Sequence, residues 1–296
     1  MFEYVAFDTT EESVRQLKEK DKAKIIAGGQ SLLTNMKLKC LAPSMLVDLR
    51  KISALHELRY VDRGLNIGAM VTYDKVAASK DVQRYYPALA EAIQLIGDPQ
   101  VRNRGTIGGS VANNDPAADL PAVVLALEAK ITIIGSDGAR TVPADEFFIG
   151  PFKTVLLPDE IITSINFPVY PAGTGSAYKK IKNPASGFAI CAIAALIELS
   201  SNKTFHKCRM AVTGAADYAM RLKEVEVLLE GKEVTLDNIA FAARSVNKGG
   251  LNFVSDLHAS AEYRAHLAQV LTERAIVSAV ERAKNLPGKS NKGGNI

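Results

Sequence analysis

The sequence has 296 residues, of which 47% are hydrophobic and 23% are charged, and its formal net charge is +4. This length and composition predict a globular protein with a large core, built as two domains or as one domain with subdomains. The small net charge, with acidic and basic residues interspersed, argues against a nucleic-acid-binding surface.

Three cysteines, Cys40, Cys191 and Cys208, are far apart and form no CxxC pair. This spacing argues against a disulfide framework, a zinc site or an iron–sulfur cluster held by this chain alone. The first residues show no basic segment followed by an apolar run, and no segment reaches the ~18 apolar residues of a membrane span. We therefore expect a soluble, cytoplasmic protein that does not bind membranes, with cysteines that are reduced packing residues.

The N-terminal part predicts a helix, a strand, a second helix and a second strand. Thr9 or Thr10 can cap the first helix, whose acidic first turn and basic last turn suit the helix dipole. The sequence AGGQS at 27–31 then follows the first strand and opens the second helix, a position where anions bind. The expected helices span 12–20 and 31–39, and the expected strands span 23–26 and 45–49.

The middle of the chain predicts a hairpin, several helices and three more strands. The hairpin turns at Asp62, Arg63 and Gly64. Asp119 begins an apolar helix, LPAVVLALEA, in which an acidic residue suits the first turn. The expected strands are 58–61, 65–68, 130–134, 140–142 and 161–167, and the other expected helices are 72–78 and 86–96.

A segment rich in proline and glycine, 168–175, is typical of a connection between domains. Three strands of an antiparallel sheet are expected after it, although the run 188–199 is long and apolar enough to be a helix instead. Helices then complete the chain, followed by a tail at 287–296 that we expect to be mobile. The strands are 176–182, 188–199 and 207–213, and the helices are 221–230, 235–248 and 259–285.

The stretch Arg104 to Asp119, RGTIGGSVANNDPAAD, suits neither a helix interior nor a plain strand. Its glycines let backbone N–H groups approach a guest closely, and its hydroxyls and amides add donors, so it predicts a cradle for phosphate oxygens. Together with AGGQS it predicts two loops that close on one diphosphate. The alternative is that each sequence is a capped turn and that Asp119 is only a helix cap.

Other chemistry finds no support in the sequence. Neither GxGxxG nor GxxxxGK[ST] occurs, which argues against a Rossmann cofactor site and a P-loop. The four histidines lack HExxH spacing, and no GxSxG sequence provides a nucleophile. We therefore expect no catalytic residue and no metal ligand on this chain.

The two glycine sequences also carry a resemblance. With AGGQSLL, TIGGSVANNDPAADLPA and SDLHASAEYRAHL at 255–267, the chain resembles the FAD-binding subunits of molybdenum hydroxylases from about Phe2 to Ala283. This family includes the flavoproteins of xanthine dehydrogenase, CO dehydrogenase and nicotinate dehydrogenase. The resemblance implies an α+β fold with an FAD-binding domain of the vanillyl-alcohol-oxidase or PCMH type, whose two subdomains are about 1–55 and 56–172. A C-terminal domain at 173–286, with a three-stranded antiparallel sheet and a helical bundle, is implied after it.

The resemblance also implies which residues bind FAD. The two glycine loops match pyrophosphate-binding loops, Asn113 and Asp119 match positions beside the ribityl and phosphate portion, and Lys179 matches a lysine near the isoalloxazine. Apolar residues match positions beside the rings or the adenine. The implied FAD-binding residues are Ile26, Ala27, Gly28, Gly29, Gln30, Ser31, Leu32, Ile96, Thr106, Gly108, Gly109, Ser110, Asn113, Asp115, Asp119, Ile162, Lys179 and Phe188.

Some positions depart from related flavoproteins. Gln30 stands where members of the wider superfamily can carry a histidine bonded to the flavin, so FAD is expected to be non-covalent. Relatives often have an acidic residue followed by an aromatic after the strand of Lys179, whereas this chain has PASGF at 184–188. Phe188 can still cover a flavin face, but it lacks a hydroxyl, and the missing acid leaves the preferred electron acceptor open. The four-cysteine insertion of hydroxybenzoyl-CoA reductase flavin subunits is absent.

The function implied by the resemblance is electron transfer within a multi-subunit oxidoreductase. Electrons would pass from [2Fe-2S] clusters on one partner subunit through FAD to NAD(P)+ or another acceptor. A second partner subunit with the molybdenum cofactor would hydroxylate an N-heterocycle such as nicotinate or a purine, and a dimer of hetero-oligomers is expected. Two alternatives stay open: a self-sufficient FAD-dependent reductase or oxidase, and a nucleotide-binding regulatory protein without redox chemistry.

Overall fold

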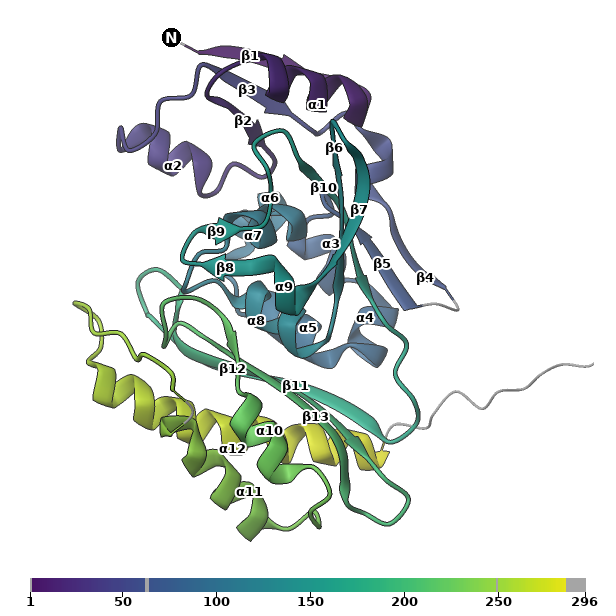
Figure 1. Cartoon of the computed structure of the whole chain (residues 1–296), viewed down its shortest axis with the longest axis vertical. Coiled ribbons are helices and arrows are strands. Elements are labelled where there is room, and N and C mark those ends of the chain that lie inside the picture. Colours follow the sequence, from purple (N-terminus) through teal and green to yellow (C-terminus); the bar gives the residue numbers. More distant parts are fainter. Residues whose placement is uncertain (1, 62–63, 249, 286–296) are drawn as a thin grey trace, which may run out of the picture.

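A computed structural model describes residues 2–61, 64–248 and 250–285, and these form three bodies along the long axis of the molecule (Figure 1). An N-terminal lobe contains a parallel sheet, a central body contains a five-stranded sheet with helices, and a C-terminal body contains an antiparallel sheet covered by helices. The expected tail, 287–296, and the turn residues Asp62 and Arg63 lie outside the described residues. No helix in the described parts combines the length and apolar character that a membrane crossing needs.

The N-terminal lobe has the predicted alternation of helices and strands, preceded by one strand that was not predicted. Thr9 caps α1 by accepting a hydrogen bond from the backbone N–H of Glu12, as expected. Strand β1 pairs in parallel with β3, but it is only four residues long and largely exposed, so its sequence gives little signal. The elements are β1 (Glu3–Ala6), α1 (Thr10–Glu19), β2 (Ala23–Ile26), α2 (Leu32–Lys37) and β3 (Met45–Asp48).

The central body is built around a sheet in the order β4-β5-β10-β6-β7 and the buried helices α5 and α8. The predicted hairpin and strands are confirmed, whereas helices α4 and α6 and the hairpin of β8 and β9 were not predicted. The elements are η1 (Ser53–His56), β4 (Leu58–Val61), β5 (Gly64–Gly68), α3 (Tyr73–Ala77), α4 (Lys80–Tyr85), α5 (Pro87–Gln94), α6 (Pro99–Arg104), α7 (Ile107–Asn113), α8 (Asp119–Ala126), β6 (Lys130–Gly135), β7 (Gly138–Pro143), α9 (Ala144–Phe147), β8 (Phe148–Gly150), β9 (Lys153–Thr154) and β10 (Ile161–Phe167).

The glycine stretch that was expected to be a loop is largely a helix, α7, and the expectation was wrong on this point. Thr106 caps the helix, because its hydroxyl accepts a hydrogen bond from Gly109 N at 3.1 Å. Gly108 lies so close to Ala69 that an added Cβ would come within 2.5 Å of the Ala69 side chain. Close packing against the sheet therefore offsets the low helix propensity of glycine.

The C-terminal body confirms the strand prediction for 188–199 and rejects the helical alternative. A two-residue strand, β14, extends the expected three-stranded sheet to the order β11-β12-β13-β14. Cys191 and Cys208 are buried as expected, but Cys40 is exposed, so a packing role is wrong for Cys40. The elements are β11 (Thr174–Lys182), β12 (Ala189–Leu199), β13 (Phe205–Thr213), β14 (Met220–Arg221), α10 (Lys223–Leu229), α11 (Leu236–Arg244), η2 (Ser245–Asn247) and α12 (Ala261–Asn285).

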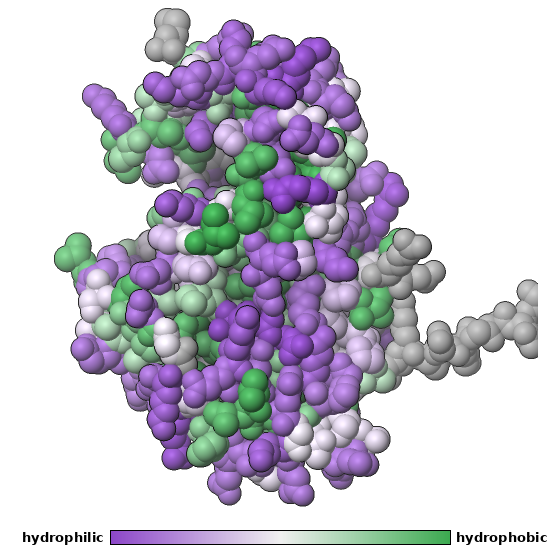
Figure 2. All heavy atoms as spheres, in the orientation of Figure 1, coloured by the Kyte–Doolittle hydropathy of each residue, from purple (hydrophilic) through white to green (hydrophobic). Residues whose placement is uncertain are grey.

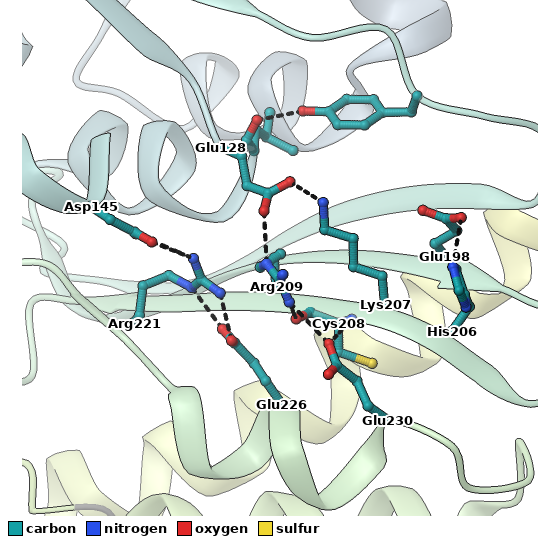
Figure 3. Close-up of polar contacts among 12 residues, drawn as sticks. Glu128, Asp145, Glu198, His206, Lys207, Cys208, Arg209, Arg221, Glu226 and Glu230 are labelled. Atoms are coloured by element: carbon teal, nitrogen blue, oxygen red, sulfur yellow. Dashed lines mark hydrogen bonds and ion pairs between the residues drawn. The ribbon is translucent and has the colours of Figure 1, made fainter. Parts of the chain in front are cut away.

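An ion-pair network joins the C-terminal body to the central body (Figure 3). Glu128, just after α8, accepts from Lys207 at 2.5 Å and from Arg209 at 2.8 Å, and both partners lie on β13. Arg221 makes a second bridge, because it contacts Asp145 of the central body and Glu226 of α10. Burial raises the pKa of Glu128, but the hydrogen bonds from Lys207 and Arg209 outweigh burial and hold the pKa below its usual value.

We predict that Glu128→Gln lowers the free energy of unfolding by about 1–2 kcal/mol at pH 7, because the charge-assisted bonds to Lys207 and Arg209 are lost. Since the folded pKa is lowered, the stabilisation is full above the ordinary value of 4.5 and disappears as pH falls through the folded value. Urea denaturation at pH 7 and below pH 4.5 measures both effects. Glu146→Gln, which removes an equally negative but exposed side chain, is the control. An equal loss in both variants at pH 7 would contradict a specific role for Glu128.

Candidate functional site

The structure brings the two glycine sequences together at the boundary between the N-terminal lobe and the central body. A Cβ at Gly28 would lie 2.2 Å from the carbonyl oxygen of Arg104, so only glycine allows this approach. Asn113, at the end of α7, donates from Nδ2 to the hydroxyl of Ser31 at 3.5 Å. Segments some 75 residues apart in sequence therefore face each other.

The two segments differ in what their backbones can offer a ligand. In α7, the first three N–H groups donate to Val71 O, Ala69 O and the Thr106 hydroxyl, at 3.1, 2.9 and 3.1 Å. In contrast, no described residue accepts a hydrogen bond from the N–H groups of 28–31. A row of free N–H groups at the end of a strand is suited to an anion. The backbone of 28–31 is therefore suited to phosphate oxygens, and α7 lies beside it with its side chains.

Polar side chains of α7 and the segment after it are held in place by neighbours. Burial raises the pKa of Tyr73 to about 12, and a hydrogen bond with Ser110 opposes the shift. Asp115 accepts from Ala117 N at 2.9 Å, and burial raises the pKa of its carboxyl. These contacts fix the backbone around α7, which a ligand bound beside it would require.

Asp119 lies at the first position of α8 and is the centre of a buried polar cluster. Its carboxylate accepts from the Tyr178 hydroxyl at 2.5 Å and from Lys180 Nζ at 2.8 Å. Burial raises the pKa of Asp119, and the positive charge of Lys180 opposes that shift. Both carboxylate oxygens are thus bonded within the chain, which matches the role of ordering its surroundings.

Lys179, predicted to lie near the isoalloxazine, and its neighbour Lys180 lie on opposite faces of β11. Side chains alternate along β11, so Tyr178 and Lys180 face α8, whereas Lys179 lies on the face that packs against α12. Lys180 has a fully buried side chain, and it also donates to Gly187 O at 2.7 Å and to Leu95 O at 3.1 Å. Lys180, which was not predicted, is therefore the lysine that contacts Asp119. Strand alternation, applied to Tyr178 and Lys180, could have found it.

Lys180 contacts the segments that contain two other predicted residues, Ile96 and Phe188. It donates hydrogen bonds to the backbone carbonyls of their neighbours, Leu95 and Gly187. The two segments lie close together, because a Cβ at Gly187 would be 3.3 Å from Gly97 Cα. Phe188 is 45% exposed, so part of it is accessible to a ligand.

The other predicted residues are distributed between the surface and the core. Gln30 is exposed beside the cradle, and Leu32 is partly buried behind it. Ile26 and Ile162 are core residues with exposed fractions of 7% and 4%. The described residues contain no group of three or more His, Cys, Asp or Glu side chains that could hold a metal ion.

Comparison with known proteins gives matches over nearly the whole chain. Residues 1–170 match the family described as "FAD binding domain in molybdopterin dehydrogenase", and residues 176–279 match "CO dehydrogenase flavoprotein C-terminal domain". The 6-hydroxypseudooxynicotine dehydrogenase complex subunit alpha of Paenarthrobacter nicotinovorans is 37% identical, over 96% of both chains. The carbon monoxide dehydrogenase medium chain of Hydrogenophaga pseudoflava is 38% identical, over 95% of this chain and 98% of the relative.

Solved structures agree with these matches. A chain of the carbon monoxide dehydrogenase from Hydrogenophaga pseudoflava superposes with a TM-score of 0.91 at 39% identity, covering 95% of this chain and 98% of that chain. A chain of quinoline 2-oxidoreductase from Pseudomonas putida 86 has a TM-score of 0.89 at 31% identity, covering 96% and 98%.

We predict that Lys180→Met lowers the free energy of unfolding by about 3–5 kcal/mol, because it leaves the buried Asp119 carboxylate without its cation. Lys179→Met, on the opposite face of the same strand, changes it by no more than about 0.5 kcal/mol. Adding Asp119→Asn to Lys180→Met restores part of the loss by removing the isolated charge. Urea denaturation of the three variants measures these differences, and similar losses for the two lysine variants would contradict a specific role for the pair of Lys180 and Asp119.

Proposed function

Because the chain belongs to the family of FAD-binding medium subunits of molybdenum hydroxylases, we propose that it holds FAD and conducts electrons within such a complex. The members that match it are oxidoreductase components. The observation that carries the proposal is the row of free N–H groups at 28–31, placed against α7 by the contacts of Gly28 and Asn113. A flavin dinucleotide has a diphosphate that such a row can bind.

The residues of the site fit the parts of FAD. The backbone of 28–31 would hold the diphosphate, with Thr106, Gly108 and Gly109 shaping the facing helix. Ser31, Ser110 and Asn113 offer polar groups to the sugar or the ribityl chain. Ile96 and Phe188 offer apolar surface to the rings, at the end of the site that Lys180 organises. When bound, FAD supplies the redox chemistry, and the protein binds, orients and tunes it.

Two side chains determine how the cofactor would be held. Gln30 cannot form the covalent flavin bond that a histidine forms at the matching position, so binding is non-covalent. The ammonium group of Lys180 lies between the backbone carbonyls of Leu95 and Gly187 and donates a hydrogen bond to each. A fixed positive charge near the rings favours added negative charge on them. Asp119 keeps that ammonium in place and partly neutralises it.

We propose that electrons reach this subunit from [2Fe-2S] clusters on one partner subunit, which receive them from substrate at the molybdenum cofactor of another. The cysteines of this chain support a separate cluster carrier, because Cys191 and Cys208 are buried and Cys40 stands alone at the surface. NAD(P)+ or another acceptor takes the electrons from the flavin. The names of the nicotine-derived and quinoline relatives support an N-heterocycle such as nicotinate or a purine as substrate of the whole complex.

The proposal includes how the chain is organised. An FAD-binding domain at 1–172, with subdomains of about 1–55 and 56–172, precedes a C-terminal domain at 173–286. The separate sheets of the three bodies support this division. We also propose a cytoplasmic complex that is a dimer of hetero-oligomers. The names of the relatives as subunits and medium chains support the presence of partner subunits.

We predict that Asn113→Asp weakens FAD binding about tenfold or more, because it places a negative charge beside the diphosphate cradle. Fluorescence titration of the purified full chain with FAD measures the dissociation constant, and absorbance spectra and FAD release on denaturation measure the bound flavin. Asn247→Asp, an exposed substitution of the same type in the C-terminal body, is the control and leaves the affinity unchanged.

Equal affinities of the two variants would contradict the assigned cradle. A folded, unsubstituted chain that takes up no FAD, alone or in its complex, would contradict the proposed function. Turnover of an organic substrate by this chain alone would favour a self-sufficient flavoenzyme instead.

A further inference from the structure

The β8–β9 hairpin carries an exposed aromatic residue in a strained backbone conformation. Phe152, at its turn, has φ of +54°, in the left-handed region that bulky residues rarely adopt. Its side chain is 61% exposed, and that of Ile149 on β8 is 57% exposed. An exposed apolar side chain does not stabilise the fold, and neither does the strained backbone of Phe152. The presence of these two residues at the hairpin therefore needs another explanation.

Asn114 holds this turn rigidly. The side chain of Asn114 is fully buried, and its Nδ2 donates to Gly150 O at 2.7 Å and to Lys153 O at 2.9 Å. The backbone carbonyl oxygen of Asn114 accepts from Phe152 N at 3.0 Å. These three bonds determine the shape of the turn, which explains how the strained conformation persists. The backbone that carries the exposed side chains is therefore held in one arrangement.

The hairpin lies at the edge of the candidate FAD site. Asn114 directly follows Asn113, the residue of α7 that contacts Ser31 of the phosphate cradle. Figure 2 shows hydrophobic spheres gathered over the region of β8 and β9 in Figure 1, just below the N-terminal lobe. A protein docked on this hairpin would thus stand beside the flavin site on the same body of the molecule.

We propose that Ile149 and Phe152 form the contact for the partner subunit that carries the [2Fe-2S] clusters. The inference rests on the proposed function, which requires that an electron donor come close to the flavin. A surface continuous with the flavin site meets that requirement. Val227 on α10 and Phe241 on α11 are also exposed apolar residues, but a protein docked on them would be far from the flavin site. Their helices belong to the C-terminal body, at the other end of the molecule (Figure 1).

A rigid aromatic anchor gives contact area at little cost in conformational entropy on binding. Because Phe152 is strained, one substitution at this position can change the stability of the fold and the affinity for a partner in opposite directions. Asparagine adopts the left-handed conformation more readily than phenylalanine. A substitution by asparagine therefore relieves strain in the folded chain while it removes the anchor.

We predict that Phe152→Asn has a Tm equal to or higher than that of the unsubstituted chain and an unchanged FAD affinity, but binds the iron–sulfur subunit about tenfold or more weakly. Ile149→Ser weakens the same binding. Phe241→Ala, which removes an equally exposed aromatic side chain, leaves it unchanged. Titration of the full chain with the purified iron–sulfur subunit measures affinity, and calorimetry measures Tm. Unchanged affinity of Phe152→Asn, or a loss explained by a lower Tm, would overturn the inference.

The neighbour of the hairpin is identified by placing photoreactive benzoylphenylalanine at position 152 in the intact complex. A cross-link to the iron–sulfur subunit supports the inference. A cross-link to the molybdenum subunit or to a second copy of this chain overturns it, and the proposed function is unaffected. A complex that contains no iron–sulfur subunit contradicts the proposed function itself, which distinguishes the two failures.

Discussion

The buried ion pair between Asp119 and Lys180 is the interaction on which the site depends. Its two side chains are 4% and 0% exposed, so neither charge has water to solvate it. Each charge is tolerated only because the other is present and because the hydroxyl of Tyr178 and two backbone carbonyls complete the hydrogen bonds. The pair joins α8 of the central body to β11 of the C-terminal body, and an unpaired partner would be costly. The relative position of the two bodies is therefore specified at this point more strictly than apolar packing alone would specify it.

The other side of the site depends on close backbone approach rather than on charge. Gly28 lies against Arg104 O, a Cβ at Gly109 would lie 3.6 Å from Ala27 Cβ, and Asn113 bonds Ser31. A ligand that contacts both segments adds interactions between the N-terminal lobe and the central body. Ligand binding therefore stabilises the position of the lobe against that body. Such a ligand at 100 times its dissociation constant stabilises the folded state by about 2.7 kcal/mol. The charged side of the site is thus fixed by the chain, and the glycine side gains stability from its ligand.

The sequence predicted most elements because strong local patterns agree with the tertiary structure. The strands 23–26 and 161–167 and the cap at Thr9 follow from period-two patterns and capping chemistry. Helix α7 could not be predicted from its glycines, because the packing of Gly108 on Ala69 is a contact between distant parts of the chain. Likewise, no local pattern indicates that Asn114 bonds a hairpin some 36 residues away. Lys180 differs, since strand alternation places it on the same face as Tyr178, toward α8, and places Lys179 on the other face.

Three of the six non-glycine residues with positive φ in the described chain, Glu128, Asn114 and Phe152, lie at or between contacts that join parts of the molecule. Glu128 has φ of +49°, and its carboxylate gains the bonds to Lys207 and Arg209 that join two bodies. Asn114 has φ of +44°, and its buried amide gains the bonds to the hairpin. In both residues, the strained backbone places a side chain in contacts that offset the strain. Phe152 has the same strain, but it is 61% exposed, so the described residues cover less than half of it. A partner surface that covers the ring would supply such a contact, which is why the hairpin is explained by assembly rather than by folding.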